Sequence, residues 1–219
     1  MTENQTPTPS AELDFDAWLA GGERAAHYVN LYARLDLIAS IEELEKQRIE
    51  VPEIPEGEEA LGGEENPNRD LDERINALYA EVDASKREFR VEALTDEESD
   101  EIQAKVRTDL SDQIDAAATE GQKEARKTAK RLGVTAPADI NSLVRVGANE
   151  TATALVNRET ALRKIAQATK VRQGDTWLPL TVDHVRALYK KLGQAQIDML
   201  ANAAMRAANE VPEVTIPKS

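Results

Sequence analysis

The sequence contains no cysteine. Disulfide frameworks, thiolate nucleophiles and zinc-thiolate centres are therefore excluded as sources of stability or chemistry. The absence of thiols agrees with a reducing compartment. Any chemical function of this chain has to come from other side chains.

Positive charge and long apolar runs are also scarce. The 219 residues include 27 Lys and Arg against 41 Asp and Glu, which gives a net charge of -14. So acidic a chain repels nucleic-acid phosphates. No stretch approaches the roughly 18 apolar residues of a membrane span, and the polar start MTENQTPTPSAELD does not resemble a signal peptide. We expect no nucleic-acid partner, no membrane partner, and a protein that stays where it is made.

Aromatic residues make up only 4% of the chain, whereas 41% of its residues are hydrophobic, many of them alanine. These numbers predict a thin helical core. A thin core leaves stability modest, which favours a subunit that completes its packing on a partner. Self-association is one way to do so.

No strong catalytic or metal-binding motif occurs in the sequence. His27 and His184 are the two histidines, each expected in a helix without a sequence-adjacent partner. The spacings of zinc proteases, phosphate-binding loops, nucleophile elbows and EF-hands are absent. Acidic pairs stand among polar neighbours, without the apolar surroundings that shift a pKa for acid-base work. We predict no catalytic, cofactor or metal residue, and a protein that is not an enzyme.

The N-terminal third divides into three segments. Residues 1–12 are polar and are expected to be disordered. Residues 13–49 form a helical segment, in which Gly21 and Gly22 separate a short piece with Phe15 and Trp18 from a long helix. Residues 50–69 are rich in proline, glycine and glutamate and are expected to form an acidic linker. The three- and four-residue spacing of the long helix is carried by Tyr28, Leu31, Leu35, Ile38, Ile41 and Leu44.

Residues 70–136 are expected to form a central helical region with one short strand. A helix over 71–85 precedes REFRVEAL, where Phe89 and Val91 alternate with polar residues as in a half-buried strand near residues 87–92. Its pairing partner is left open: this chain, a second copy or a client protein, unless the segment is an extended loop. Thr95 and Glu98 then predict a capping box, and residues 115–130 predict a solvated helical arm.

Residues 137–219 are expected to form a C-terminal helical region with an extended tail. Gly133 and Pro137 separate it from the arm. Its first helix has a broad apolar stripe that is interrupted near Gly147, and RQGDTWLPL is expected to be a loop. Thr181 begins the next helix, and Gly193 marks a corner before a last helix whose inward residues are Ile197, Leu200, Ala204 and Ala207. The fold class is therefore all-α and bundle-like, with a short β element.

A partner-binding surface is the functional site that this pattern favours. Methionine and alanine on the last helix make a shallow, adaptable face for a client helix, although the same residues also suit an ordinary core. Trp18 and Trp177 are open to the same two interpretations, partner anchors or core packing. The candidate partner-binding residues are Phe89, Val91, Tyr189, Ile197, Met199, Leu200, Ala204 and Met205.

The order of these elements resembles the tail assembly chaperones of long-tailed phages of actinobacteria. The similarity begins in the linker and is most specific in LTVDHVRALYKKLGQAQIDMLANAAMRAAN with its tail VPEVTIPKS. The resemblance implies a protein of the host cytoplasm that binds the tape measure protein, keeps it soluble and helps tail tube subunits polymerise around it. It also implies absence from the mature virion.

Many members of this family are also made in a longer form by a ribosomal frameshift near the end of the gene. Ile216 to Lys218 can be encoded ATC CCA AAG, which contains a slippery heptamer, so the resemblance predicts a longer product that shares residues up to about Lys218. Two alternatives stay open. One is an acidic scaffolding or structural protein, found in particles or precursor shells. The other is an acidic regulatory or DNA-mimic protein, whose binding to a basic partner is strongly salt-sensitive.

Overall fold

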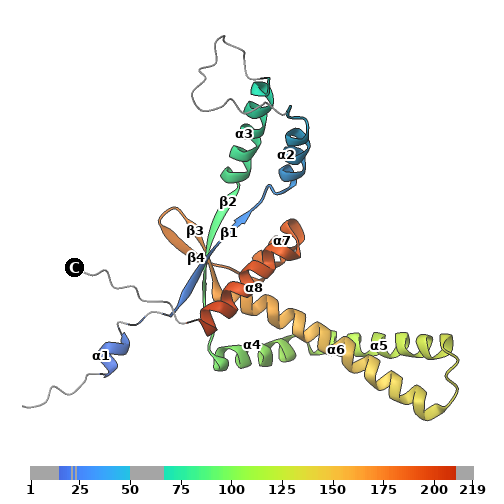
Figure 1. The fold of residues 1–219 in the computed structure, drawn as a ribbon. Helices are drawn as coiled ribbons and strands as arrows, with labels where there is room; N and C mark the ends of the chain where they lie inside the picture. Colours follow the sequence, from blue (N-terminus) through green and yellow to red (C-terminus); the bar gives the residue numbers. More distant parts are fainter. Residues whose placement is uncertain (1–14, 21, 23, 50–66, 211–219) are drawn as a thin grey trace, which may run out of the picture.

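The computed structural model describes residues 15–20, 22, 24–49 and 67–210, which are mostly helical and include a small antiparallel sheet (Figure 1). The expectation of a helical protein with a short β element is confirmed in that form. Residues 1–12, which were expected to be disordered, lie outside the described residues. Most of the predicted linker and the predicted extended tail lie outside them as well. A short helix, α1 (Phe15–Ala20), precedes the sheet, as the two glycines predicted.

The sheet has four strands in the order β1-β2-β3-β4, with every neighbouring pair antiparallel. The strand predicted around Phe89 is β2, and it lies between β1 and β3. Phe89 is opposite Val29 of β1 on one side and Val171 of β3 on the other. Both partners of the predicted strand are therefore in this chain. The strands are β1 (Ala26–Tyr32), β2 (Lys86–Glu92), β3 (Thr169–Gln173) and β4 (Thr176–Pro179).

The prediction of a long helix through residues 26–32 was wrong, because this segment is strand β1. Tyr28 and Leu31 fit a helical spacing, but Val29 and Leu31 also alternate with exposed residues as in a strand. Pairing along the whole length of β2 decides between the two patterns, since strand formation depends more on neighbours than on local preference. The helix α2 begins only at Asp36 and ends at Lys46.

The segment RQGDTWLPL, predicted to be a loop, belongs mainly to the β3–β4 hairpin. Gly174 has a φ of 60° in the two-residue turn, which is the conformation that tight hairpins require and that glycine adopts without strain. Arg172 is opposite Trp177 in this hairpin. The strands are short, so their alternation is weak as a signal on the sequence.

Three helices cover one face of the sheet and form with it a unit that we call the head. They are the end of α6 (Pro137–Ala168), α7 (Val182–Leu192) and α8 (Gln194–Asn209). The predicted cap at Thr181 and the predicted corner at Gly193, where φ is 82°, are confirmed. Figure 1 shows α7 and α8 beside the strands. The buried core of the head consists of Leu31, Phe89, Val91, Leu162, Ile165, Ala166, Ala168, Val185, Ile197, Leu200 and Ala203.

A helical hairpin of α2 and α3 (Arg69–Ala84) projects from one end of the sheet (Figure 1). It has its own small core, in which Ile41 and Leu44 pack with Ile75 and Val82. The buried Asn68 amide accepts a hydrogen bond from the Ile49 N–H at 2.9 Å and donates one to the Ile49 carbonyl at 2.8 Å. The hairpin is therefore closed just before α3 begins.

The second projection, which we call the arm, consists of α5 (Ser111–Arg131) and the part of α6 that faces it. The helix α4 (Asp96–Asp109) leads into it and begins at Thr95 and Glu98 with the predicted capping box. The prediction of a solvated arm holds for only part of the surface of α5, because one face of the helix packs along α6 while most of residues 115–130 are exposed. Gly121 and Gly147 allow this close approach, and α6 continues through Gly147 without interruption. Gly133, with a φ of 68°, follows α5 as predicted, and Pro137 begins α6.

Candidate functional site

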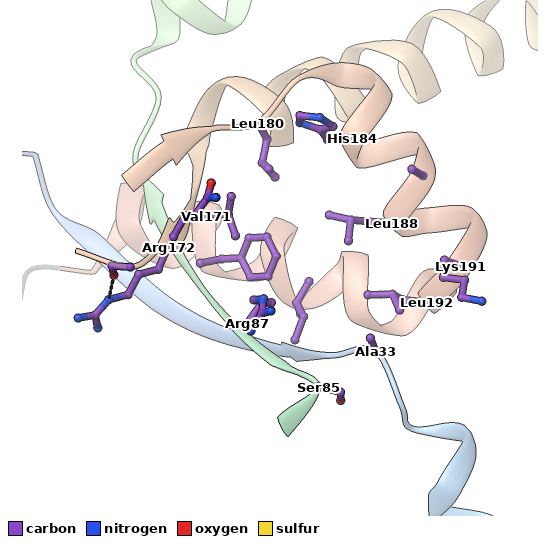
Figure 2. Close-up of a pocket in the computed structure, with 15 residues that line it drawn as sticks. Ala33, Ser85, Arg87, Val171, Arg172, Leu180, His184, Leu188, Lys191 and Leu192 are labelled. Carbon is purple, nitrogen blue, oxygen red and sulfur yellow. Dashed lines mark hydrogen bonds between the residues drawn. The ribbon is translucent and has the colours of Figure 1, made fainter. Parts of the chain in front are cut away.

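A groove of about 770 Å³ lies between the covered face of the sheet and α7 (Figure 2). Its floor is apolar and combines residues that are far apart in the sequence. The sheet contributes Leu31, Phe89 and Val171, and α7 contributes Leu188 and Leu192. Figure 2 shows Val171, Leu180, Leu188 and Leu192 around the hollow.

The two walls of the groove follow from the local sequence. In antiparallel neighbours, residues opposite one another point to the same face, so the pairing of Phe89 with Val171 gives the sheet wall its apolar surface. On α7, Leu188 and Leu192 are four residues apart and therefore share one face of the helix. The Thr181 side chain accepts a hydrogen bond from the His184 N–H at 3.2 Å and so fixes the start of that helix.

The rim of the groove is cationic. Arg87 and Lys191 stand at its border, and none of the described residues that line it is an Asp or Glu. Arg172 also lines it, but Arg172 is opposite Trp177, so its side chain belongs to the other face of the sheet. Arg172 donates to Glu88 at 2.9 Å and to the Gly174 carbonyl at 3.2 Å. Arg87 and Lys191 form no ion pair with the part of the chain that the structure describes, and Arg87 donates only to a backbone carbonyl. Two exposed cations are thus free to meet carboxylates of a bound molecule.

His184 lies at the rim as well, but its ring takes part in the cap of α7. Its Nδ1 accepts a hydrogen bond from the Thr181 N–H at 3.3 Å. The ring therefore helps to close the start of the helix, and the other nitrogen, Nε2, carries the proton in the neutral form. In a neighbouring hollow that also contains Lys191, the hydrogen bond from Arg34 holds the pKa of the Asp36 carboxyl below its ordinary value, and Lys191 adds to this effect.

Charge is divided unevenly along the chain: the N-terminal part has an excess of acidic residues, and the C-terminal part has a small excess of basic ones. Residues 1–136 contain 33 Asp and Glu against 16 Lys and Arg, whereas residues 137–219 contain 8 against 11. The groove wall on α7 and the β3–β4 hairpin belong to the second part. The cations at the groove can therefore pair with carboxylates of a partner at short range, although the net charge of -14 repels acidic molecules at longer distances.

A second hollow of about 630 Å³ lies on the other side of α7, against α6 and α8. Tyr189 and Ile197 line it together with Leu162 and Arg186. The Arg186 guanidinium donates to Glu159, and this hydrogen bond raises the pKa of Arg186 above its ordinary value. Arg158 and Lys190 line this hollow as well, but so does the carboxylate of Asp198. Its border is therefore mixed in charge, which makes it a weaker candidate for an acidic partner.

The eight predicted partner-binding residues do not form one surface. Phe89, Val91, Ile197 and Leu200 are buried in the core of the head, and Phe89 also forms part of the groove floor. Ala204 is half-buried at the edge of the same core. Tyr189, Met199 and Met205 are exposed, by 40%, 45% and 58% respectively. The exposed residues keep their predicted role as candidates, whereas a partner cannot reach Val91 or Leu200 in the folded chain.

The two tryptophans were open to interpretation as anchors or as core residues. Trp177 is half-buried on β4, and its ring centre lies 5.8 Å from that of Tyr28 on β1. This places it on the sheet face opposite the head core. The side chain of Trp18 lies outside the described residues.

Sequence reasoning did not find the groove residues Leu31, Arg87, Val171, Leu188 and Lys191. The hairpin turn Gly174-Asp175 was the available signal, because a two-residue turn of this type between alternating residues is typical of paired strands. It predicts the strand that carries Val171. No local signal predicts that this strand lies against the helix that begins at Thr181.

The arrangement is suited to holding a segment of another molecule. Over the described ranges, no group of three or more His, Asp or Glu side chains could hold a metal ion, and none of the helices there is long and apolar enough to cross a membrane. Comparison with known protein families, curated proteins and solved structures gives no match.

Proposed function

We propose that this protein is a tail assembly chaperone that holds an amphipathic segment of the phage tape measure protein in the groove between the sheet and α7. In this proposal it keeps the tape measure protein soluble in the host cytoplasm, promotes assembly of tail tube subunits, and is absent from the mature virion. The fold that serves this role is a helical bundle extended by a small sheet.

The groove is the observation that carries the proposal. An amphipathic helix binds by laying its apolar face into an apolar groove, and each Å² of apolar surface that it buries contributes about 25 cal/mol. Leu188 and Leu192 offer such a surface, and Arg87 and Lys191 are placed to pair with carboxylates at its border. The resemblance to tail assembly chaperones supports the same assignment, because its most specific stretch includes α7, one wall of the groove.

The net charge of the rest of the molecule supports the proposal independently. A client that is rich in apolar helix faces aggregates unless those faces are covered. Residues 1–136 contribute a large negative excess, which keeps a loaded complex soluble through repulsion between complexes. The basic groove and the acidic remainder therefore have separate roles, one in capture and one in solubility.

The test is co-expression of the full chain with the tape measure protein of the same phage, with the soluble fraction of the client as the readout. The groove variant Arg87→Glu/Lys191→Glu is expected to reduce the soluble client severalfold, because it turns both rim cations into carboxylates. Both side chains are exposed, so the free energy of unfolding is expected to change by less than about 0.5 kcal/mol per site.

The matched control is Lys105→Glu/Lys130→Glu, which makes the same change in net charge on the exposed surface of α4 and α5. It is expected to keep the client soluble. Equal loss in both double variants would mean that only net charge matters, and no loss in either would refute the groove as the client site. Binding that persists at moderate salt would separate this proposal from a DNA mimic.

The predicted longer product gives a second test, which does not depend on the groove. The gene is expressed with its native downstream DNA, and the products are analysed by intact-mass and peptide mass spectrometry. A product that shares this N-terminus and extends past Lys218 is expected. Detection of the chain in purified particles would instead favour a structural or scaffolding protein. Residues 211–219, which include the frameshift site, lie outside the described residues.

A further inference from the structure

The two edges of the sheet are protected differently. On the β4 edge, the Leu180 N–H donates inward to the Thr169 carbonyl, so the backbone groups of Trp177 and Pro179 point outward. Proline has no N–H to offer, and an added strand would lose a hydrogen bond there. The β4 edge is therefore closed to strand addition.

On the β1 edge, the hydrogen-bond pattern shows which residues point outward. The Ala33 N–H donates to the Ser85 carbonyl, and the Ala93 N–H donates to the Ala25 carbonyl. In an antiparallel pair, backbone groups alternate between the two sides of a strand. The odd-numbered residues of β1 therefore bond to β2, and the backbone groups of the even-numbered residues point away from the sheet.

One of these outward residues is already satisfied. The buried Gln196 side chain accepts from the Tyr32 N–H and donates to the Tyr32 carbonyl, both at 2.8 Å. The backbone groups of Ala26, Tyr28 and Asn30 have no hydrogen-bond partner among the described residues. The open part of the edge thus consists of the outward backbone groups of these three residues. It ends before Tyr32, whose backbone groups are bound by Gln196.

The composition of β1 is unusual for an exposed edge. Its sequence AHYVNLY contains no Lys, Arg, Asp or Glu, although 31% of the chain is charged. Edge strands are normally blunted by charge or proline to prevent association. Tyr28, in the middle of the open part, is 61% exposed and touches the Trp177 ring. An uncharged edge with an aromatic centre is a surface that favours pairing.

We propose that β1 pairs antiparallel with β1 of a second copy of this chain, about a two-fold axis at Tyr28. In this register Tyr28 pairs with the second copy's Tyr28, and Ala26 pairs with the second copy's Asn30. Every open outward residue is then used in both copies, and the closed residue Tyr32 is left outside. A two-fold interface brings the same residues of both copies together, so a charged edge would repel its own copy. β1 contains no Lys, Arg, Asp or Glu, and this absence of like charges favours a second copy as the partner.

The same register brings the two Tyr28 rings side by side, each against the Trp177 of its own copy. Opposite residues in a hydrogen-bonded antiparallel pair have Cα atoms about 5.5 Å apart, so the four rings form one cluster and cover the exposed tyrosines. Aromatic cross-strand pairs stabilise sheets. This inference concerns an edge away from the groove and does not depend on the proposed function.

The absence of cysteine permits a test that is specific for this register. In Tyr28→Cys the two thiols would be about 5.5 Å apart between Cα atoms, within disulfide range, so mild oxidation of the full chain is expected to give a covalent dimer. The matched control is Asn30→Cys, at a residue that is also exposed. Its thiols would be four residues out of register, about 14 Å apart, and no rapid cross-link is expected.

A second measurement does not use cysteine. Light scattering after gel filtration is expected to give twice the chain mass of 24.1 kDa for the wild type. Asn30→Pro removes an outward N–H that the fold does not use, and it is expected to raise the dimer dissociation constant at least about tenfold. Asn30→Thr is expected to leave the dimer and the melting temperature unchanged. A wild-type monomer at about 0.1 mM, or equal cross-linking of Tyr28→Cys and Asn30→Cys, would overturn the proposal.

Discussion

The head and the arm are held together by different kinds of contact. In the head, large side chains such as Leu31, Phe89 and Leu200 fill the space between the sheet and the helices. In the arm, the buried residues of α5 are Gly121 and Ala129. A Cβ atom added at Gly121 would lie 2.2 Å from the Gly147 carbonyl oxygen, so the two helix backbones are in direct contact there.

The difference shows that a segment poor in large apolar residues can still pack closely along one face. The head gains stability mainly from the apolar area that it removes from water. The arm gains it from many short-range dispersion contacts, which only small side chains permit. The two regions should therefore respond differently to the same kind of substitution: loss of volume damages the head, and gain of volume damages the arm.

The largest effect is expected from loss of volume in the head. Leu200 is fully buried, so Leu200→Ala is expected to lower the free energy of unfolding by about 3 kcal/mol, through lost burial and the cavity that remains. Urea unfolding followed by circular dichroism measures it. The control Met205→Ala, on the exposed side of the same helix, is expected to change it by less than about 0.5 kcal/mol. Similar losses in both would mean that α8 does not pack as described.

Gain of volume in the arm is expected to have the next largest effect. Gly→Ala normally stabilises a helix interior by about 1 kcal/mol, but at Gly121 the added methyl group meets backbone atoms that cannot move aside. Gly121→Ala is therefore expected to be destabilising by about 1 to 3 kcal/mol. Urea unfolding measures this loss of stability, and faster hydrogen exchange of the backbone amides in α5 and α6 would show that it arises in the arm.

Gly147→Ala gives a graded comparison within the arm. Its added Cβ would lie 2.9 Å from the Ala125 Cβ and from the Gly121 carbonyl oxygen, a looser fit than at Gly121. A smaller loss is expected, measured in the same way. If Gly121→Ala were more stable than the wild type, α5 and α6 would not be in close contact, and the contrast between arm and head would fail.

The start of α4, which connects the head to the arm, is expected to show a smaller effect. The Thr95 side chain accepts from the Glu98 N–H at 3.1 Å, so Thr95→Ala is expected to lower the free energy of unfolding by about 1 kcal/mol. Thr95→Ser, which keeps the hydroxyl, is the control in the same urea titration. A full loss with serine would assign the effect to the methyl group rather than to the cap.

The smallest effect is a pH dependence at the same cap. Hydrogen bonds from the Thr95 N–H and from Arg24 lower the pKa of Glu98. The ionised Glu98 side chain therefore stabilises the folded chain above the unfolded pKa of about 4.3. This stabilisation is lost as the pH falls through the lower pKa of the folded state. Glu98→Gln is expected to be less stable than the wild type at pH 7, with a difference that shrinks below about pH 4. A constant difference from pH 7 to pH 3 would contradict this assignment.

Local signals predicted the elements whose causes are local. Thr95, Thr181 and Gly193 were predicted as helix boundaries, because caps and corners depend on a few neighbouring residues. The strand around Phe89 was predicted because its alternation is strict. β1 was missed because Tyr28 and Leu31 satisfy a helical spacing as well, and only pairing with β2 excludes the helix. Of the predicted site residues, only Phe89 lines the groove between the sheet and α7.

The sequence by itself determined the acidic character of the chain, its high helix content, the position of the central strand, and the ends of several helices. Only the tertiary structure decided which strands pair and which helices pack against them. The groove depends on contacts between Leu31, Phe89, Val171 and Leu188, which pairing and packing bring together over more than 150 residues. The open part of β1 depends on Gln196, 164 residues away from Tyr32. Such contacts leave no local pattern, because their energy comes from the partner and not from the neighbours along the chain.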